Sequence, residues 1–255
     1  MRTVALAFLL TALLSITSLA QIKKPLPPAV KAPYDSSLQA VVVVTPDWPS
    51  VTGTAQMFER KTPKSDWKRV DASFPVVVGR SGLACGDTER KPTNVDRIKK
   101  EGDGNSPAGL FPLIASFGTA VKPEALESPY TKLDQYTECV DDVASNHYNK
   151  IVNRMQVGAF DWKSSEKMLE IGERYELGIV VGYNMYPVQP GRGSCIFLHI
   201  WSGPGEATSG CTAMERRNLE RLFGWLSPSK NPYLIQMPAS EYDRSRKAWK
   251  LPKLK

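Results

Sequence analysis

Short hydrophobic runs separated by turn-forming residues make up most of the chain after about residue 35. The run at 38–45 (LQAVVVVT) is rich in β-branched residues, and the run at 177–184 (LGIVVGYN) has an apolar centre. Such runs are typical of buried strands. Similar runs predict strands at 55–60, 67–70, 74–79, 111–114, 136–140 and 232–238, and a short one near Tyr130. The pattern therefore predicts one mainly β domain over residues 35–242, with few helices.

Alternating positions in segment 194–201 (SCIFLHIW) assign its side chains to two faces of a strand. Cys195, Phe197, His199 and Trp201 share one face, because side chains alternate along a strand. The other face carries the aliphatic residues of the segment. This strand places a histidine at its end, beside a loop of small residues (SGPGEATS).

Two segments have the pattern of helices. Segment 164–175 begins with serine and has a glutamate just inside, which predicts a short helix. Thr212 and Glu215 match a capping box, and the apolar residues after them recur at helical spacing. A helix is therefore predicted from about Ala213 to Leu226, with Thr212 as its N-cap.

The composition agrees with a folded β protein. The chain has 255 residues, of which 42% are hydrophobic, so it can form a real core. Its 20 prolines and 18 glycines argue against a helical bundle. The net charge of +7 suggests an anionic environment or partner.

The first twenty residues have the organisation of a secretory signal peptide. Arg2 provides the positive start, residues 4–14 form an apolar stretch, and Ser18 and Ala20 are small residues at the positions that a signal peptidase recognises. The apolar stretch is too short for a stable membrane anchor, and no later stretch is long enough to span a membrane. We therefore expect cleavage after Ala20 and a protein that is exported to the periplasm or the cell wall.

Two flanking segments differ in composition from the predicted domain. Residues 21–34 are proline-rich and basic, which predicts an extended linker. Residues 243–255 are basic with little apolar periodicity, which predicts a loose C-terminal tail.

The four cysteines allow two interpretations. In an oxidising compartment, Cys85, Cys139, Cys195 and Cys211 would ordinarily form two disulfides. The connectivity cannot be derived from the sequence, and a pair between Cys85 and Cys139 is one of several possibilities. The alternative is that one cysteine is a nucleophile.

Cys211 is the candidate for that nucleophile. If Thr212 caps a helix, Cys211 lies beside the helix N-terminus, where the partial positive charge favours a thiolate. The free backbone N–H groups there could bind an oxyanion, and Gly210 would allow a substrate close approach. A thiol nucleophile also needs a base, and His199 lies twelve residues upstream at the end of a predicted strand. The chain has only one other histidine, His147, which we assign to the surface.

Several motifs resemble the catalytic domain of YkuD-type L,D-transpeptidases. The segments GSCIFLHIW (193–201) and TSGCTAM (208–214) are similar to the active-site motif of that family. EGDGNSPAGLF (101–111) resembles its glycine-rich segment, and ECVDD (138–142) and YNKIV (148–152) resemble flanking sequences of one branch. The resemblance extends over residues 38–238.

The resemblance implies a β-sandwich-like catalytic domain, with one helix after the cysteine, that acts on peptidoglycan. Family members use a cysteine to attack the bond between the L-centre of diaminopimelate and the following D-alanine in stem peptides. If these roles apply to the matching positions of this chain, Cys211 would be the nucleophile, His199 the base, and the Ile200 carbonyl the group that orients the histidine. The backbone N–H groups of Gly210 and Cys211 would form the oxyanion hole. The product of attack, a thioester, would pass to an amine in L,D-transpeptidation or to water in a carboxypeptidase reaction.

Two positions depart from the usual family motif. Ser209 stands where most members have a second histidine, and Ala213 stands where most have an arginine. These departures leave the cysteine–histidine pair in place but make the substrate preference open. Tyr183 and Asn184, on the strand before His199, are candidates to line the cleft.

Other functional classes account for fewer of these motifs. The departures allow a non-catalytic module that binds peptidoglycan on the same fold. A papain-like peptidase is disfavoured because its cysteine precedes its histidine in the chain, whereas here the histidine comes first. A zinc site is disfavoured because no paired Cys-x-x-Cys or His-x-x-His spacing occurs. The expected partner is therefore a peptidoglycan stem peptide and not a nucleic acid, with no cofactor and no metal; the oligomeric state stays open.

Overall fold

The computed structural model describes residues 33–254, except for residues 87, 89, 91, 93–95 and 125. The predicted signal peptide (1–20) and nearly all of the predicted linker (21–34) lie outside the described residues. The described chain begins with a short 3-10 turn, η1 (Tyr34–Ser36), which leads directly into the first strand.

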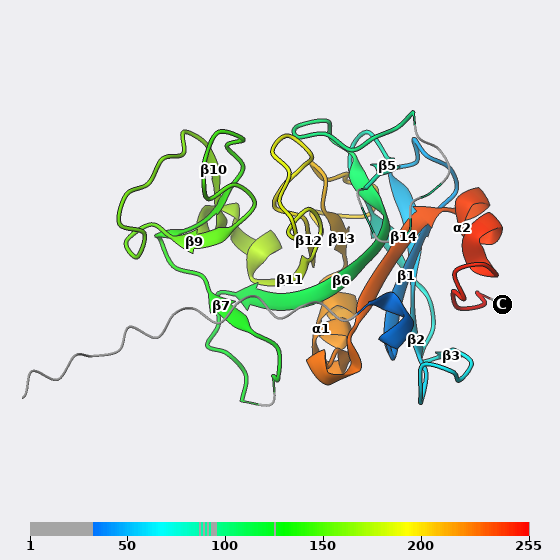
Figure 1. The fold of residues 1–255 in the computed structure, drawn as a ribbon. Coiled ribbons are helices and arrows are strands. Elements are labelled where there is room, and N and C mark those ends of the chain that lie inside the picture. Colours follow the sequence, from blue (N-terminus) through cyan, green and yellow to red (C-terminus); the bar gives the residue numbers. More distant parts are fainter. Residues whose placement is uncertain are drawn as a thin grey trace, which may run out of the picture. The chain divides into compact units, whose positions relative to one another are not determined.

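Eight strands form a sheet that closes on itself (Figure 1). Strand β1 (Gln39–Thr45) pairs in parallel with β14 (Tyr233–Pro238) on one side and antiparallel with β2 (Thr52–Glu59) on the other. From β14 the circuit runs back to β2 through five further strands, in the order β6 (Ser106–Gly118), β11 (Leu177–Val181), β12 (Phe197–Ile200), β13 (Thr212–Met214) and β4 (Phe74–Val77). The prediction of a mainly β protein with few helices is confirmed.

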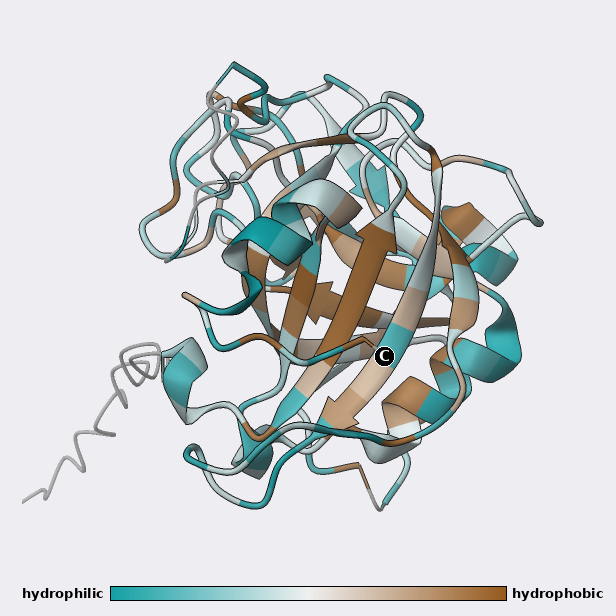
Figure 2. Cartoon of the chain, turned by 90° about the vertical axis from the view of Figure 1, so that its right-hand side faces the viewer, coloured by the Kyte–Doolittle hydropathy of each residue, from teal (hydrophilic) through white to brown (hydrophobic). Residues whose placement is uncertain are grey.

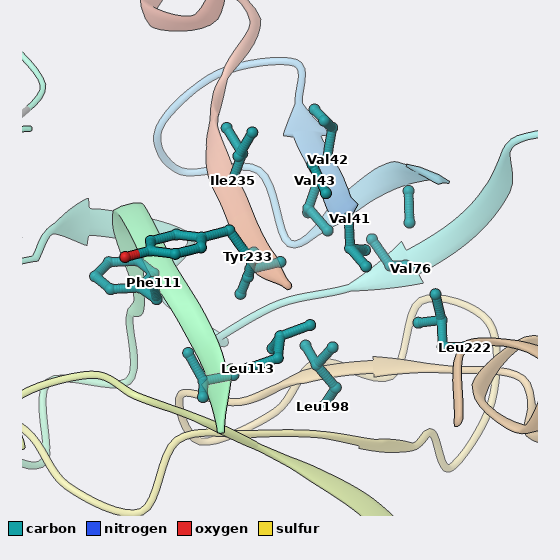
Figure 3. Close-up of a cluster of buried hydrophobic side chains, with 14 of the residues drawn as sticks. Val41, Val42, Val43, Val76, Phe111, Leu113, Leu198, Leu222, Tyr233 and Ile235 are labelled. Carbon is teal, nitrogen blue, oxygen red and sulfur yellow. The ribbon is translucent and has the colours of Figure 1, made fainter. Parts of the chain in front are cut away.

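The hydrophobic runs supply the core of this closed sheet. Residues 40–43 of β1 have no exposed surface, and all six residues of β14 are buried. Figure 3 shows side chains from several strands, among them Val41, Phe111, Leu198 and Ile235, gathered in one cluster. Strands buried on both faces need continuous apolar runs, which explains why these segments could be recognised in the sequence.

The long strand β6 differs most from its prediction. The sequence indicates a strand only at 111–114, whereas β6 has thirteen residues. Different parts of β6 pair with β5 (Leu83–Cys85), β14, β11 and β7 (Tyr130–Lys132). Pro107, Gly109 and Pro112 normally interrupt strands. Pairing with several partners along its length keeps β6 extended in spite of these residues.

The helix after Cys211 begins later than predicted. Residues 212–214 form β13, and helix α1 (Arg216–Trp225) starts only after Glu215. The hydroxyl of Thr212 donates to the Gln236 side chain at 2.7 Å, so it does not cap a helix. Pairing of β13 between β12 and β4 overrides the local capping signal. The prediction that Cys211 lies at a helix N-terminus is therefore wrong.

A second, smaller sheet lies apart from the closed one, at the opposite end of Figure 1 from α2. It has three strands in the order β10 (Ser165–Lys167), β8 (Thr137–Val140) and β9 (Ile151–Asn153). The helix predicted over 164–175 begins as strand β10 and continues as a 3-10 segment, η2 (Met168–Tyr175). Gly172, with φ of 71°, interrupts the helical conformation of η2.

The C-terminal segment packs against the closed sheet. Helix α2 (Ala239–Arg246) contacts β14 and β1, and Leu251 is buried after it. The Tyr242 hydroxyl donates to the Pro252 carbonyl at 2.7 Å, which fixes the segment beyond the helix. Residues 243–254 are thus packed, in contrast to the loose tail that the composition predicts.

The remaining elements lie at the edge of the fold. They are β3 (Lys68–Arg69), which pairs with β2, and the 3-10 turn η3 (Pro228–Lys230). Figure 2 shows hydrophobic strands at the centre and more polar helices and loops around them. Among the described residues there is no helix of sufficient length and apolar character to cross a membrane.

Candidate active site

Two adjacent strands carry the cysteine and the histidine that the sequence singled out. β12 pairs in parallel with β13, and His199 lies opposite Ala213. Cys211 directly precedes β13, so its side chain points to the same side of the sheet as that of Ala213. His199 is offset from Cys211 by two residues, roughly 7 Å along the strands. Both side chains line one pocket of about 250 Å³.

A backbone carbonyl orients the imidazole of His199. Nδ1 of His199 lies 2.8 Å from the carbonyl oxygen of Ile200. A carbonyl oxygen can only accept, so Nδ1 carries the hydrogen and Nε2 keeps its lone pair. The ring is only 5% exposed, and burial lowers its pKa to about 4, although the bond to Ile200 acts in the opposite direction. His199 is therefore a neutral base near neutral pH.

The sulfur of Cys211 is held by the backbone of the preceding strand. Sγ accepts a hydrogen bond from the Phe197 N–H at 3.3 Å and donates one to the Cys195 carbonyl at 3.4 Å. Burial, together with the nearby Glu166 carboxylate, raises the pKa of the thiol to about 12. In the described part of the chain no helix N-terminus lies beside Cys211 to lower this pKa, so the side chain is a neutral thiol at rest. The thiolate expected from the sequence is not favoured.

The loop before Cys211 is fixed by its own hydrogen bonds. The Thr208 hydroxyl donates to the Cys211 carbonyl at 2.6 Å and accepts the Gly210 N–H at 3.1 Å. The Gly210 N–H, which the resemblance places in an oxyanion hole, is thus engaged within the loop. A Cβ at Gly210 would lie 3.2 Å from the Asn105 carbonyl oxygen, so this position leaves little room for a side chain.

The glycine-rich segment 101–111 reaches the same loop. The Ser106 hydroxyl donates to the Cys211 carbonyl at 2.8 Å, and it also accepts the Gly79 N–H at 2.8 Å. Segments that are about a hundred residues apart in the chain therefore fix the backbone of Cys211 together.

Comparison with known proteins identifies the family of the chain. The model of the YkuD family, described as the L,D-transpeptidase catalytic domain, matches residues 47–235. The chain belongs to the YkuD family. No match was found among the curated proteins or the solved structures with which the chain was compared.

The two departures from the usual YkuD motif both lie at the pocket. Ser209 is exposed at its edge and Ala213 is fully buried within its lining. Neither supplies an imidazole or a guanidinium. The guanidinium-bearing residue in the lining of this YkuD pocket is Arg174, which comes from η2.

Tyr183 and Asn184 have structural positions and do not line this pocket. β11 ends at Val181, before both residues. The Tyr183 hydroxyl donates to the Arg192 carbonyl, and the Asn184 side-chain amide donates to the Gln189 and Gly193 carbonyls. Both residues therefore hold the loop that precedes β12.

Several residues of the pocket were not identified from the sequence, among them Glu166, Arg174 and Tyr175. The Tyr175 ring lies 5.3 Å from that of His199, edge to face, and its hydroxyl donates to Glu166 at 2.7 Å. Burial raises the pKa of Tyr175 well above its usual value. The only signal in the sequence was a segment with helical character, which gave no indication of proximity to Cys211.

One disulfide joins the small sheet to the candidate active site of this YkuD domain. Cys139 of β8 is bonded to Cys195, whose carbonyl accepts the thiol of Cys211. Cys85 and Cys211 form no disulfide. The interpretation of two disulfides is therefore wrong, as is a pair between Cys85 and Cys139.

The described residues contain no group of three or more histidine, cysteine, aspartate or glutamate side chains arranged to hold a metal ion.

Proposed function

We propose that this chain is a cysteine acyl-transferase that acts on peptidoglycan stem peptides. Cys211 Sγ attacks the carbonyl carbon at the L-centre of diaminopimelate, and its proton passes to Nε2 of His199. The bond to the following D-alanine breaks, and D-alanine leaves with that proton. A thioester remains on Cys211. The amine of a neighbouring stem peptide then attacks the thioester, which forms a cross-link and returns the thiol.

The observation that carries this proposal is that Cys211 and His199 line one pocket, with the imidazole oriented by the Ile200 carbonyl so that Nε2 keeps its lone pair. Both groups are neutral at rest, because burial raises the pKa of Cys211 and lowers that of His199. The histidine must therefore act during the attack, as a general base that removes the thiol proton when the substrate carbonyl arrives. Water in place of the amine would give an L,D-carboxypeptidase.

Export of the chain is part of the same proposal. The signal-like sequence at 1–20 would direct the protein to the periplasm or the cell wall, where peptidoglycan is found. The disulfide between Cys139 and Cys195 supports an oxidising compartment. The basic net charge suits an anionic wall.

Replacement of the nucleophile tests the chemistry. The wild-type protein, mixed with a tetrapeptide muropeptide, should show by mass spectrometry an acyl adduct on Cys211 and release of D-alanine. Cys211→Ala should show neither. Cys85→Ala is the matched control, because Cys85 is the other buried cysteine outside the disulfide; this variant should react like the wild type.

An adduct on Cys85, or none on any cysteine while the protein is folded by circular dichroism, would contradict the proposal. In the latter case, binding of sacculi that survives Cys211→Ala would favour the non-catalytic module.

A further inference from the structure

The pocket of Cys211 carries opposite charges that the acyl transfer leaves unassigned. Glu166 comes from β10 and Arg174 from η2, and both line the pocket together with Cys211 and His199. Glu206, an exposed residue of the loop before Cys211, also lines it. The small sheet and η2 thus supply both an anionic and a cationic group next to the nucleophile.

Glu166 faces the pocket because of its place in the small sheet. It lies opposite Cys139 in the pairing of β10 with β8, and Cys139 is tied to Cys195 beside the nucleophile. Its neighbours Ser165 and Lys167 point the other way, where both bond to the buried Glu138. Alternation along the strand therefore separates a charge cluster that stabilises the sheet from a carboxyl group that faces the site.

No cation of the described chain forms an ion pair with Glu166. Its carboxyl group accepts a hydrogen bond from the buried Tyr175 hydroxyl at 2.7 Å. Burial raises the pKa of Glu166 to about 7. A buried carboxylate without a cationic partner is energetically unfavourable. The negative charge of Glu166 also disfavours ionisation of the Cys211 thiol. Its position is more easily explained by a cation that arrives with the substrate.

Arg174 is the complementary charge. It is exposed, and within the described residues its guanidinium has no ion pair or hydrogen bond. It is nevertheless close enough to lower the pKa values of both Glu166 and His199. A free guanidinium at the edge of the pocket can bind a carboxylate through two parallel hydrogen bonds.

We propose that Glu166 and Arg174 form a subsite for a carbon that bears both an ammonium and a carboxylate group, with Glu166 binding the ammonium and Arg174 the carboxylate. This inference rests on the proposed function, since diaminopimelate in a stem peptide carries such a carbon at the end of its side chain. The group can belong to the donor peptide or to the acceptor peptide. Both sources present the same chemistry to the pocket.

For the acceptor, the subsite also accounts for activation of the amine. The Glu166 carboxylate takes one proton from the bound ammonium, which leaves a neutral amine. The amine nitrogen attacks the thioester carbon, the carbon–nitrogen bond forms, and the carbon–sulfur bond breaks with its electron pair going to Sγ of Cys211. The second nitrogen proton passes to Sγ through His199, and Glu166 then releases its proton to water.

Binding to a non-reacting protein tests the subsite directly. In the Cys211→Ala background, calorimetry with a diaminopimelate tetrapeptide should show affinities at least about tenfold weaker for Glu166→Gln and for Arg174→Gln. Glu170→Gln removes an exposed carboxylate of η2 that does not line the pocket, and it should bind like the background protein. Amidation of the side-chain carboxylate of the ligand should make binding insensitive to Arg174→Gln, and acetylation of its amine should do the same for Glu166→Gln.

Kinetics with Cys211 intact then separates the two sources. Slower thioester formation in Glu166→Gln indicates the donor group, whereas normal thioester formation with a lower ratio of cross-link to hydrolysis indicates the acceptor group. Equal affinities of both variants and the background protein, or no binding of the tetrapeptide, would overturn the subsite. Failure of the proposed function is a different result, namely binding with the expected pattern but no adduct on Cys211.

Discussion

At the scale of single residues, burial determines the protonation of His199 and Cys211, the proposed catalytic pair. His199 and Cys211 are 5% and 7% exposed, and each is shifted toward its neutral form. The 2.8 Å bond between Nδ1 and Ile200 fixes which nitrogen is the base. In the proposed reaction the proton would therefore move during the attack, as in a hydroxyl–histidine system, because no thiolate–imidazolium pair is formed beforehand.

The buried imidazole should make stability depend on pH. The pKa of His199 falls from 6.5 to about 4 on folding, so between these values the unfolded chain binds a proton that the folded chain does not. The free energy of unfolding should therefore decrease as the pH falls from 6.5 to 4, with a contribution of about 3 kcal/mol from this residue. His199→Gln should flatten the dependence, measured by urea unfolding at several pH values.

His147→Gln is the control for that measurement, since His147 is the chain's other histidine. It should leave the steep dependence in place. An equal slope in wild type and His199→Gln would show that His199 is not the group responsible.

At the scale of elements, the disulfide connects the small sheet to the closed sheet. β8 belongs to the small sheet, while Cys195 precedes β12 of the closed sheet. Between them lies a hydrophobic cluster that includes Phe117, Tyr175 and Phe197. The bond therefore holds Glu166 and Tyr175 near Cys211 as well as stabilising the fold.

Removal of this bond should lower stability and disturb the pocket. The bonded cysteines are 56 residues apart, and the chain-entropy estimate for a loop of that length is about 4 kcal/mol. The double replacement Cys139→Ala/Cys195→Ala should reduce the free energy of unfolding by an amount of this order and slow thioester formation. Denaturant unfolding, with and without a reductant, measures the first effect.

Cys85→Ala provides the comparison, because Cys85 forms no disulfide. The free energy of unfolding of Cys85→Ala should still fall when a reductant is added, whereas that of the double variant should not change. A wild-type protein equally stable with and without reductant would contradict the role assigned to the bond.

At the scale of the whole molecule, the closed sheet requires cover on its outer face. Helix α2 and the segment after it supply part of that cover, through Tyr242, Leu251 and the partly buried Trp249. The basic side chains of this segment remain at the surface while its few apolar residues point inward. A segment that appears polar by composition thus completes the core.

Leu251→Ala tests this packing. Leu251 is 5% exposed, and truncation of a buried leucine should lower the free energy of unfolding by about 3 kcal/mol. Lys253→Ala, two residues away and exposed, should change it by less than about 0.5 kcal/mol. Urea unfolding measures both effects, provided that the dependence of the free energy on urea concentration is the same in the two variants. Equal unfolding midpoints for the two variants would mean that the segment is not part of the core.

The sequence by itself determined what local pattern and residue chemistry can carry. Buried strands such as β1 and β14 are continuous apolar runs, and the spacing of His199 and Cys211 around a loop of small residues indicated a nucleophile and its base. These signals are contained in a few neighbouring residues, so they survive without knowledge of the fold.

Only the tertiary structure decided which segments meet. Residues 212–214 became a strand because β12 and β4 pair with them, despite a local signal for a helix. The partner of Cys195, the protonation of Cys211, and the approach of Glu166 and Arg174 to the pocket all depend on contacts between distant segments. Burial and strand pairing arise from the whole fold, and for that reason no local pattern could specify them.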